Sequence, residues 1–146
     1  MAVKRAFIDA ESPPSAERSA LMARVSSRDT RPEMAVRRAA HALGLRYRLH
    51  RRDLPGTPDL VFARFRTVVF IHGCFWHRHV GCKHASFPKR RAEFWREKFE
   101  KNTKRDGRIN QALCELGWRT LIIWECETRN PVLLEDVLRG FLKGTA

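Results

Sequence analysis

The sequence contains no apolar run of membrane-spanning length, and its N-terminus lacks the apolar core that a signal peptide requires. These two absences predict a cytoplasmic protein without a membrane-embedded segment. Internal repeats and low-complexity segments are also missing, and 146 residues suffice for one domain with its own hydrophobic core. We therefore expect a single domain over residues 16–146, preceded by a flexible lead-in over residues 1–15.

Acidic residues are scarce in this chain. Asp and Glu number 16 against 29 Lys and Arg, which gives a formal net charge of +13. Such an excess of positive charge on a small protein indicates a polyanionic partner, and nucleic acid is the first candidate. A basic surface that serves only solubility is the less favoured alternative, because acidic residues serve solubility better.

Cysteine is rare too, with four residues in the chain. In a cytosolic protein, such cysteines are expected to be thiols or metal ligands rather than disulfides. The spacing Cys74-x4-His79-x2-Cys82 supplies three candidate ligands within a short segment, and Cys126 would complete a tetrahedral site. Zinc is the metal that thiolate and imidazole ligands together favour.

Two features of this site stay open in the sequence. His77 and His84 are within reach of the same thiols, so the spacing alone does not select His79. Buried, reduced cysteines beside incidental histidines would explain the same residues without a metal. Cys114 is left over, and we expect it to be a thiol in the core-facing part of a helix.

Hydrophobic periodicity predicts an α/β domain with a mixed central sheet. Helices are expected at residues 16–25, 31–43, 89–115 (bent or divided near Gly107) and 131–142, and strands at residues 46–51, 60–63, 67–71 and 119–124. Thr30 fits the N-cap of the second helix, with Glu33 as its capping-box partner. The outer face of that helix is expected to carry Arg37, Arg38 and His41.

Two acidic residues are candidates for metal-dependent hydrolysis. Asp59 opens a predicted buried strand, directly after the turn residues 54–58. A carboxylate held there, near His72 and His77 at the exit of the next strand, can bind Mg²⁺ and hold a scissile phosphate. Glu33 lies on the inward side of its helix, so a second acid near Asp59 is geometrically feasible. The alternatives are a turn residue for Asp59 and a capping residue for Glu33.

Aromatic residues are interleaved with cations. Phe75 and Trp76 directly follow a predicted strand, and Trp95 lies in a helix rich in Lys and Arg. Apolar side chains that insert between base pairs kink DNA, and we favour this role for Phe75 and Trp76. Core packing is the alternative for each ring, and it is the favoured role of Phe99.

Taken together, these residues resemble the very-short-patch repair endonucleases. The resemblance extends over roughly residues 18–129. It is carried by Arg28-Asp29-Thr30 with Glu33, Leu54-Pro55-Gly56-Thr57-Pro58-Asp59, His72-Gly73-Cys74-Phe75-Trp76-His77, Glu93-Phe94-Trp95, Leu116-Gly117-Trp118-Arg119 and Trp124-Glu125-Cys126. The resemblance implies a restriction-endonuclease-like fold. It also implies an enzyme that nicks DNA 5′ to the thymine of T:G mismatches, which arise when 5-methylcytosine is deaminated.

The resemblance further implies roles for individual residues. Asp59 and the backbone carbonyl of Ile71 would bind Mg²⁺, His77 would be the general base, His72 would assist at the phosphate, and Glu33 would be a further acid of the site. A structural zinc would be held by Cys74, His79, Cys82 and Cys126. The expected DNA contacts are Phe75, Trp76, Trp95, Arg78 and Lys98.

The implied partner is double-stranded DNA with a T:G mismatch, bound by a monomer in the bacterial nucleoid, with general mismatch-repair proteins as further partners. Most restriction-like nucleases carry an acid-x-Lys pair on the strand after the metal-binding Asp, whereas this chain has Phe70-Ile71-His72 there. That difference favours a histidine-based mechanism. The alternatives are a restriction-type or transposon-linked nuclease with another DNA substrate, and a zinc-stabilised DNA-binding module without catalysis. A pure binding module would not need both Asp59 and His77.

Overall fold

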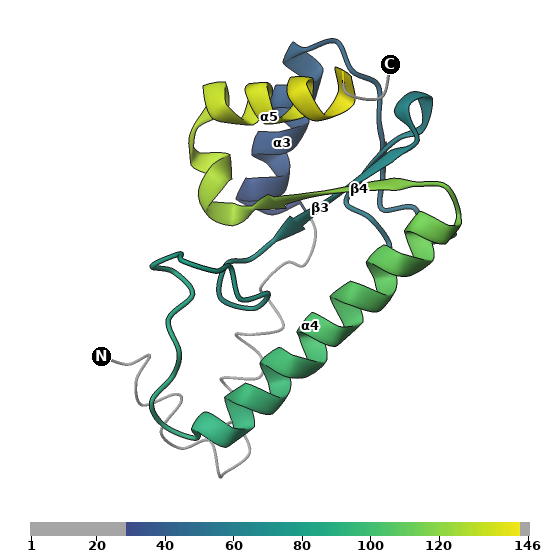
Figure 1. The fold of residues 1–146 in the computed structure, drawn as a ribbon. Coiled ribbons are helices and arrows are strands. Elements are labelled where there is room, and N and C mark those ends of the chain that lie inside the picture. The colour runs from purple at the N-terminus through teal and green to yellow at the C-terminus, as the bar shows by residue number, and fades with distance from the viewer. Residues whose placement is uncertain (1–28, 144–146) are drawn as a thin grey trace.

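The computed structural model describes residues 29–143, so the expected lead-in and the helix predicted at residues 16–25 lie outside the described part of the chain. A four-stranded sheet lies between one long helix and a pair of shorter helices (Figure 1). The elements are α3 (Arg31–Ala42), β1 (Arg48–Leu49), β2 (Leu60–Phe62), η1 (Ala63–Phe65), β3 (Thr67–His72), α4 (Ala92–Glu115), β4 (Arg119–Trp124), η2 (Glu125–Arg129) and α5 (Pro131–Lys143). None of the described helices is both long and apolar enough to cross a membrane.

The sheet is mixed, as the sequence predicts. Its strand order is β1-β2-β3-β4; the first two pairs are antiparallel, and β3 pairs with β4 in parallel. The parallel register runs from Thr67 opposite Arg119 to His72 opposite Trp124. The segments that follow His72 and Trp124 therefore leave the sheet side by side, although α4 separates the two strands in the sequence (Figure 1).

Alternating side chains cover the two faces of the sheet, as expected for β-strands buried on both sides. One core cluster joins α3 and α5 to the sheet, with Leu60, Phe62, Val69 and Ile123 among its strand residues. A second cluster joins α4 to the opposite face, and its members are Leu54, Val61, Val68, Leu113 and Trp118, flanked by Phe70 and Ile109. This three-layer arrangement fits the restriction-endonuclease-like fold.

Three local expectations differ from the structure. The helix α4 continues through Gly107 without a break, because the packing of Ile109 and Leu113 outweighs the cost of about 1 kcal/mol for a helical glycine. The strand β1 is shorter than expected and stops before His50, whose φ of 46° is left-handed. Cys114 is exposed rather than in the core, because it lies one residue past Leu113 and therefore around the side of the helix.

Candidate active site and metal centre

Asp59 immediately precedes β2 and lies against the main chain of β3. Its Oδ2 accepts a hydrogen bond of 2.8 Å from the backbone N–H of Ile71, and its side chain is 20% exposed. Burial has the largest effect on the pKa of Asp59 and raises it above its ordinary value. The Ile71 hydrogen bond and the charges of His50 and Arg37 lower this pKa and Glu33 raises it, and the net result is a raised pKa. A carboxylate in partial isolation from water is a good ligand for a divalent cation, because the bound cation stabilises its charged form.

Glu33 is buried near Asp59, and one of the two hydrogen bonds of its predicted capping box forms. Thr30 Oγ1 accepts a hydrogen bond of 3.4 Å from the Glu33 N–H, as an N-cap should. The Glu33 carboxylate returns to the backbone N–H of Asp29, at 2.9 Å, instead of the N–H of Thr30 itself. Its Oε2 also lies 3.5 Å from His50 Nε2, and His50 Nδ1 lies 4.0 Å from Asp59 Oδ1. The two acids are thus neighbours across one imidazole.

Arg37 does not face outward as the helical pattern predicts. Its side chain is 11% exposed and forms ion pairs with Asp29 at 2.8 Å and with Glu33 at 3.1 Å. The reason is electrostatic, because the buried carboxylate of Glu33, one helical turn away, needs a compensating charge. Arg38 is exposed, as expected.

A pair of stacked imidazoles lies where β3 ends. His72 is the last residue of β3, and His77 follows in a turn that is closed by its N–H donating to the Gly73 carbonyl at 3.1 Å. The two ring centroids are 3.8 Å apart, with 11° between the ring planes. Asp106 reaches across from α4, and its Oδ2 lies 2.6 Å from His77 Nδ1.

This geometry determines what each imidazole can do. A carboxylate accepts hydrogen bonds, so His77 carries a proton on Nδ1 and, when neutral, presents a lone pair on Nε2. Burial and then the neighbouring His77 lower the pKa of His72 to about 4, against a smaller opposite effect of Asp106. His72 is therefore neutral at neutral pH. The acid group and the imidazole pair both adjoin the end of β3, because Asp59 is hydrogen-bonded to the backbone of Ile71 and His72 is the next residue.

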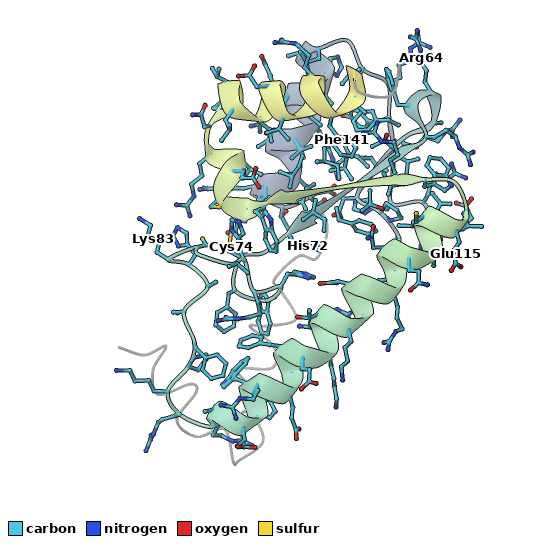
Figure 2. The ribbon with its side chains drawn as sticks, viewed as in Figure 1. Arg64, His72, Cys74, Lys83, Glu115 and Phe141 are labelled. Carbon is cyan, nitrogen blue, oxygen red and sulfur yellow. The ribbon has the colours of Figure 1, made fainter. Side chains whose placement is uncertain are left out.

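The predicted zinc ligands gather just beyond this strand end. Sulfur and nitrogen atoms of Cys74, His79, Cys82 and Cys126 all lie within 4.8 Å of one another. Cys74 follows β3 and lies close to His72 (Figure 2), whereas Cys126 belongs to η2, directly after β4. The parallel pairing of the two strands therefore brings Cys126 to thiols that lie far away in the sequence.

The donor atoms fit a tetrahedral zinc ion. The distance from Cys126 Sγ to His79 Nδ1 is 3.5 Å. Tetrahedral zinc with ordinary Zn–S and Zn–N bonds would separate these two ligand atoms by about 3.6 Å. The His79 ring is fixed by stacking on Trp124, at 4.2 Å between centroids. Of the alternatives, His77 is paired with Asp106 instead, and His84 lies at the surface beside Arg129.

The electrostatics of the thiols also fit a cation. Burial, and then contact with Cys74 and Cys82, raises the pKa of Cys126 to about 12. The backbone N–H of His84 is the main group that lowers the pKa of Cys82. Several thiolates so close together repel one another, and a metal ion at their centre removes that penalty.

Aromatic side chains form a cluster between the loop after β3 and the first turns of α4. Phe75 packs edge-on against Trp95 and Phe99, with ring centroids 5.7 Å and 5.2 Å apart. Trp76 lies at the surface, 41% exposed, and Lys98 Nζ is 5.5 Å from the centre of its ring. Trp76 and Lys98 therefore present an aromatic face and a positive charge together.

Two expected DNA contacts are placed differently. Trp95 is 5% exposed and lies inside the aromatic cluster rather than on its surface. The Arg78 guanidinium lies 4.2 Å from the centre of the Phe99 ring and donates hydrogen bonds to three loop carbonyls, those of Phe75, Ala85 and Ser86. Arg78 therefore holds the loop in shape, because its donors are directed into the protein.

Comparisons with known proteins show the family of this chain. A sequence model of the family described as "DNA mismatch endonuclease Vsr" matches residues 12–84. The type II nicking enzyme V.XorIIP of Xanthomonas oryzae pv. oryzae is 51% identical over 122 residues, which cover 84% of this chain and 89% of the relative. The DNA mismatch endonuclease Vsr of Escherichia coli is 45% identical over 121 residues, covering 83% of this chain and 77% of the relative. The chain belongs to the Vsr family. It is therefore a Vsr-like DNA endonuclease that nicks DNA.

Sequence reasoning missed three residues of this Vsr-family site: Asp106, His50 and Arg37. Asp106 carries a signal, because it lies three and seven residues before Ile109 and Leu113 and so shares their inward helical face. No sequence signal points to His50, because its side-chain direction depends on the left-handed backbone that ends β1 at this residue. The inward position of Arg37 can be recognised only once its neighbour Glu33 is known to be buried.

Proposed function

We propose that this Vsr-family endonuclease nicks DNA 5′ to the thymine of a T:G mismatch, with Mg²⁺ at Asp59 and His77 as general base. The proposal rests on the His77–Asp106 pair, whose side-chain atoms lie 2.6 Å apart. The His77 ring stacks on His72, the last residue of β3, and Ile71, the residue before His72, is hydrogen-bonded to Asp59. A carboxylate beside an oriented imidazole suits hydrolysis of a phosphodiester. The Escherichia coli relative is named for mismatched DNA, which supports the mismatch as substrate.

Asp59 and the backbone carbonyl of Ile71 would hold the Mg²⁺ ion. Bound there, the ion would supply charge stabilisation at the scissile phosphate. Glu33 stands behind Asp59 and is already hydrogen-bonded to Asp29 and Arg37, so it shapes the electric field of the site. Hydrogen bonding from the Ile71 N–H keeps Oδ2 of Asp59 fixed, whereas Oδ1 lies outside this bond, 4.0 Å from His50 Nδ1.

His77 would take a proton from the attacking water at Nε2. Its Nδ1–H is held by Asp106, which both orients the ring and stabilises the imidazolium that forms. His72, neutral because burial lowers its pKa to about 4, would donate a hydrogen bond to a phosphate oxygen without adding positive charge beside that imidazolium. One of the stacked rings would thus act as the general base and the other as a hydrogen-bond donor.

We further propose that Cys74, His79, Cys82 and Cys126 hold a structural zinc. Four protein ligands would leave no open coordination position, which is typical of structural rather than catalytic zinc. The ion would join the loop after β3 to the segment after β4 and so fix the strand end that carries His72.

Trp76, supported by Phe75, would enter the base stack beside the mismatch, while Lys98 contacts a phosphate. A T:G pair stacks less well than a Watson–Crick pair, so insertion beside it costs less free energy. The exposed ring of Trp76, backed by the buried cluster, is a rigid wedge suited to this use.

The test compares binding and nicking in one variant. Asp59→Asn should bind T:G duplex with wild-type affinity and lose nicking in Mg²⁺, because phosphate contacts by Lys and Arg do not need the Asp59 charge. Asp53→Asn is the matched control, since Asp53 is an exposed acid paired with Arg51 in the loop before Asp59. Nicking by Asp59→Asn near the wild-type rate would disprove the catalytic assignment. Equal nicking of T:G and C:G duplexes by the wild type would instead favour another DNA substrate.

A further inference from the structure

Behind Asp59 lies a second group of side chains with the composition of a divalent-cation site. Ligand atoms of Asp29, Glu33 and His50 all lie within 4.8 Å of one another. The two carboxylates are donors that Mg²⁺, Ca²⁺ and Mn²⁺ accept, whereas the imidazole suits softer divalent ions such as Zn²⁺. By composition alone, this group would compete with Asp59 for the metal.

The space among these three side chains already contains a cation. The Arg37 guanidinium places Nη1 at 2.8 Å from Asp29 Oδ1, and Nη2 at 3.1 Å from Glu33 Oε2 and 3.3 Å from His50 Nε2. Each prospective ligand is therefore in contact with the same group. That guanidinium is largely buried and carries a positive charge.

Arg37 also contacts the imidazole of His50, which lies between Glu33 and Asp59. Arg37 Nη2 lies 3.3 Å and Glu33 Oε2 lies 3.5 Å from His50 Nε2, so a donor and an acceptor both contact this ring nitrogen. Nδ1 is the atom that faces Asp59 Oδ1, at 4.0 Å. Arg37 thus acts on Asp59 through His50, and on the charge beside Asp59 through Glu33.

We propose that Arg37 is a positioning residue that fills the cation position among Asp29, Glu33 and His50 and thereby restricts divalent-metal binding to Asp59. The inference rests on the proposed function, in which Asp59 binds Mg²⁺. A guanidinium fixed among these ligands repels a divalent ion from the position that it occupies. It also neutralises the buried Glu33 carboxylate. A divalent ion is consequently excluded from the position among these three side chains.

Calorimetric titration of untagged, zinc-loaded protein with Ca²⁺, without DNA, tests this directly. Wild type should show one Ca²⁺ site, which loses at least tenfold in affinity in Asp59→Asn and persists in Glu33→Gln. Arg37→Gln should show a second site, and adding Glu33→Gln to Arg37→Gln should abolish it. Arg37→Lys should rescue the single-site behaviour, because an ammonium in the same place excludes the metal too. Arg38→Gln is the matched control, an exposed arginine on the same helix, and should match the wild type.

A single site in Arg37→Gln would overturn the proposal. If that variant is too unstable to titrate, its melting temperature should rise more with Ca²⁺ than that of the wild type, because a ligand of the native state stabilises it. An equal rise would also overturn the proposal. So would a Ca²⁺ site in the wild type that survives Asp59→Asn and disappears in Glu33→Gln. Wild-type binding unchanged by Asp59→Asn and by Glu33→Gln would refute Mg²⁺ at Asp59, and Arg37→Gln would still decide the role of Arg37.

Discussion

Replacing Asp106 with Asn tests whether the pairing with His77 contributes to catalysis. The substitution keeps the shape of the side chain and removes the charge that holds the imidazole by its Nδ1–H at 2.6 Å. Hydrogen bonds to charged groups contribute about 1.5–3 kcal/mol. Both side chains here are 22% exposed, so water partly replaces the bond and the lower half of that range applies. A loss of about 1.5–2 kcal/mol in the transition state slows nicking about 10- to 30-fold.

The assay for Asp106→Asn is single-turnover nicking of a T:G duplex with enzyme in excess, alongside a band-shift measurement of DNA affinity at the same salt concentration. Glu100→Gln is the matched control, because it removes an acid from the exposed side of the same helix, where Glu100 pairs with Lys104 at 3.0 Å. Only the nicking rate of Asp106→Asn should fall. A loss of less than threefold, or an equal loss in Glu100→Gln, would refute the role assigned to Asp106.

Three other predictions concern recognition, zinc and pH. Trp76→Ala should lose more affinity for T:G duplex than for matched duplex, whereas Lys98→Ala should weaken both similarly, when each is measured at one salt concentration. Cys126→Ser should lower the zinc content from about one per chain and reduce the melting temperature, whereas Cys114→Ser should change neither. The pKa of His72 is about 4 in the folded protein and 6.5 for an imidazole exposed to water, as in the unfolded chain. The His72 side chain is therefore protonated in the unfolded chain before it is protonated in the folded protein as the pH falls. The free energy of unfolding should therefore decrease from pH 6.5 to about 4, and His72→Gln should make that decrease smaller.

Each of these predictions has a result that contradicts it. Equal losses on both duplexes would leave Trp76 with a packing role alone. Full zinc content in Cys126→Ser, by elemental analysis, would remove it from the ligand set. An unfolding curve with the same pH dependence in His72→Gln as in the wild type would show that His72 does not titrate differently on folding.

The sequence predicts the layers of this fold because hydrophobic periodicity is a local property. The positions of Asp59 and His72 are also predicted, because they stand at strand ends that the hydrophobic pattern defines, and His77 follows in the turn after β3. Contact between distant segments is predicted only where the residue types signal it, as with Cys126 and the other candidate zinc ligands. The contact of Asp106 with His77, 29 residues apart, has no such signal of shared chemistry and is not predicted. Sequence reasoning also gives the wrong side for Arg37, because a helical pattern assigns every arginine to water and takes no account of a buried acid nearby.

The parallel pairing of β3 with β4 has a consequence for the order in which the enzyme becomes active during synthesis. The ribosome releases Asp59, His72 and His77 well before α4 and β4, yet the strand that supports the end of β3 is β4. Asp106 arrives with α4, and Cys126, 47 residues after His79, arrives later still. A nascent chain therefore carries its candidate catalytic side chains without the partners that orient them. Nicking should begin only once the chain is long enough to complete the sheet.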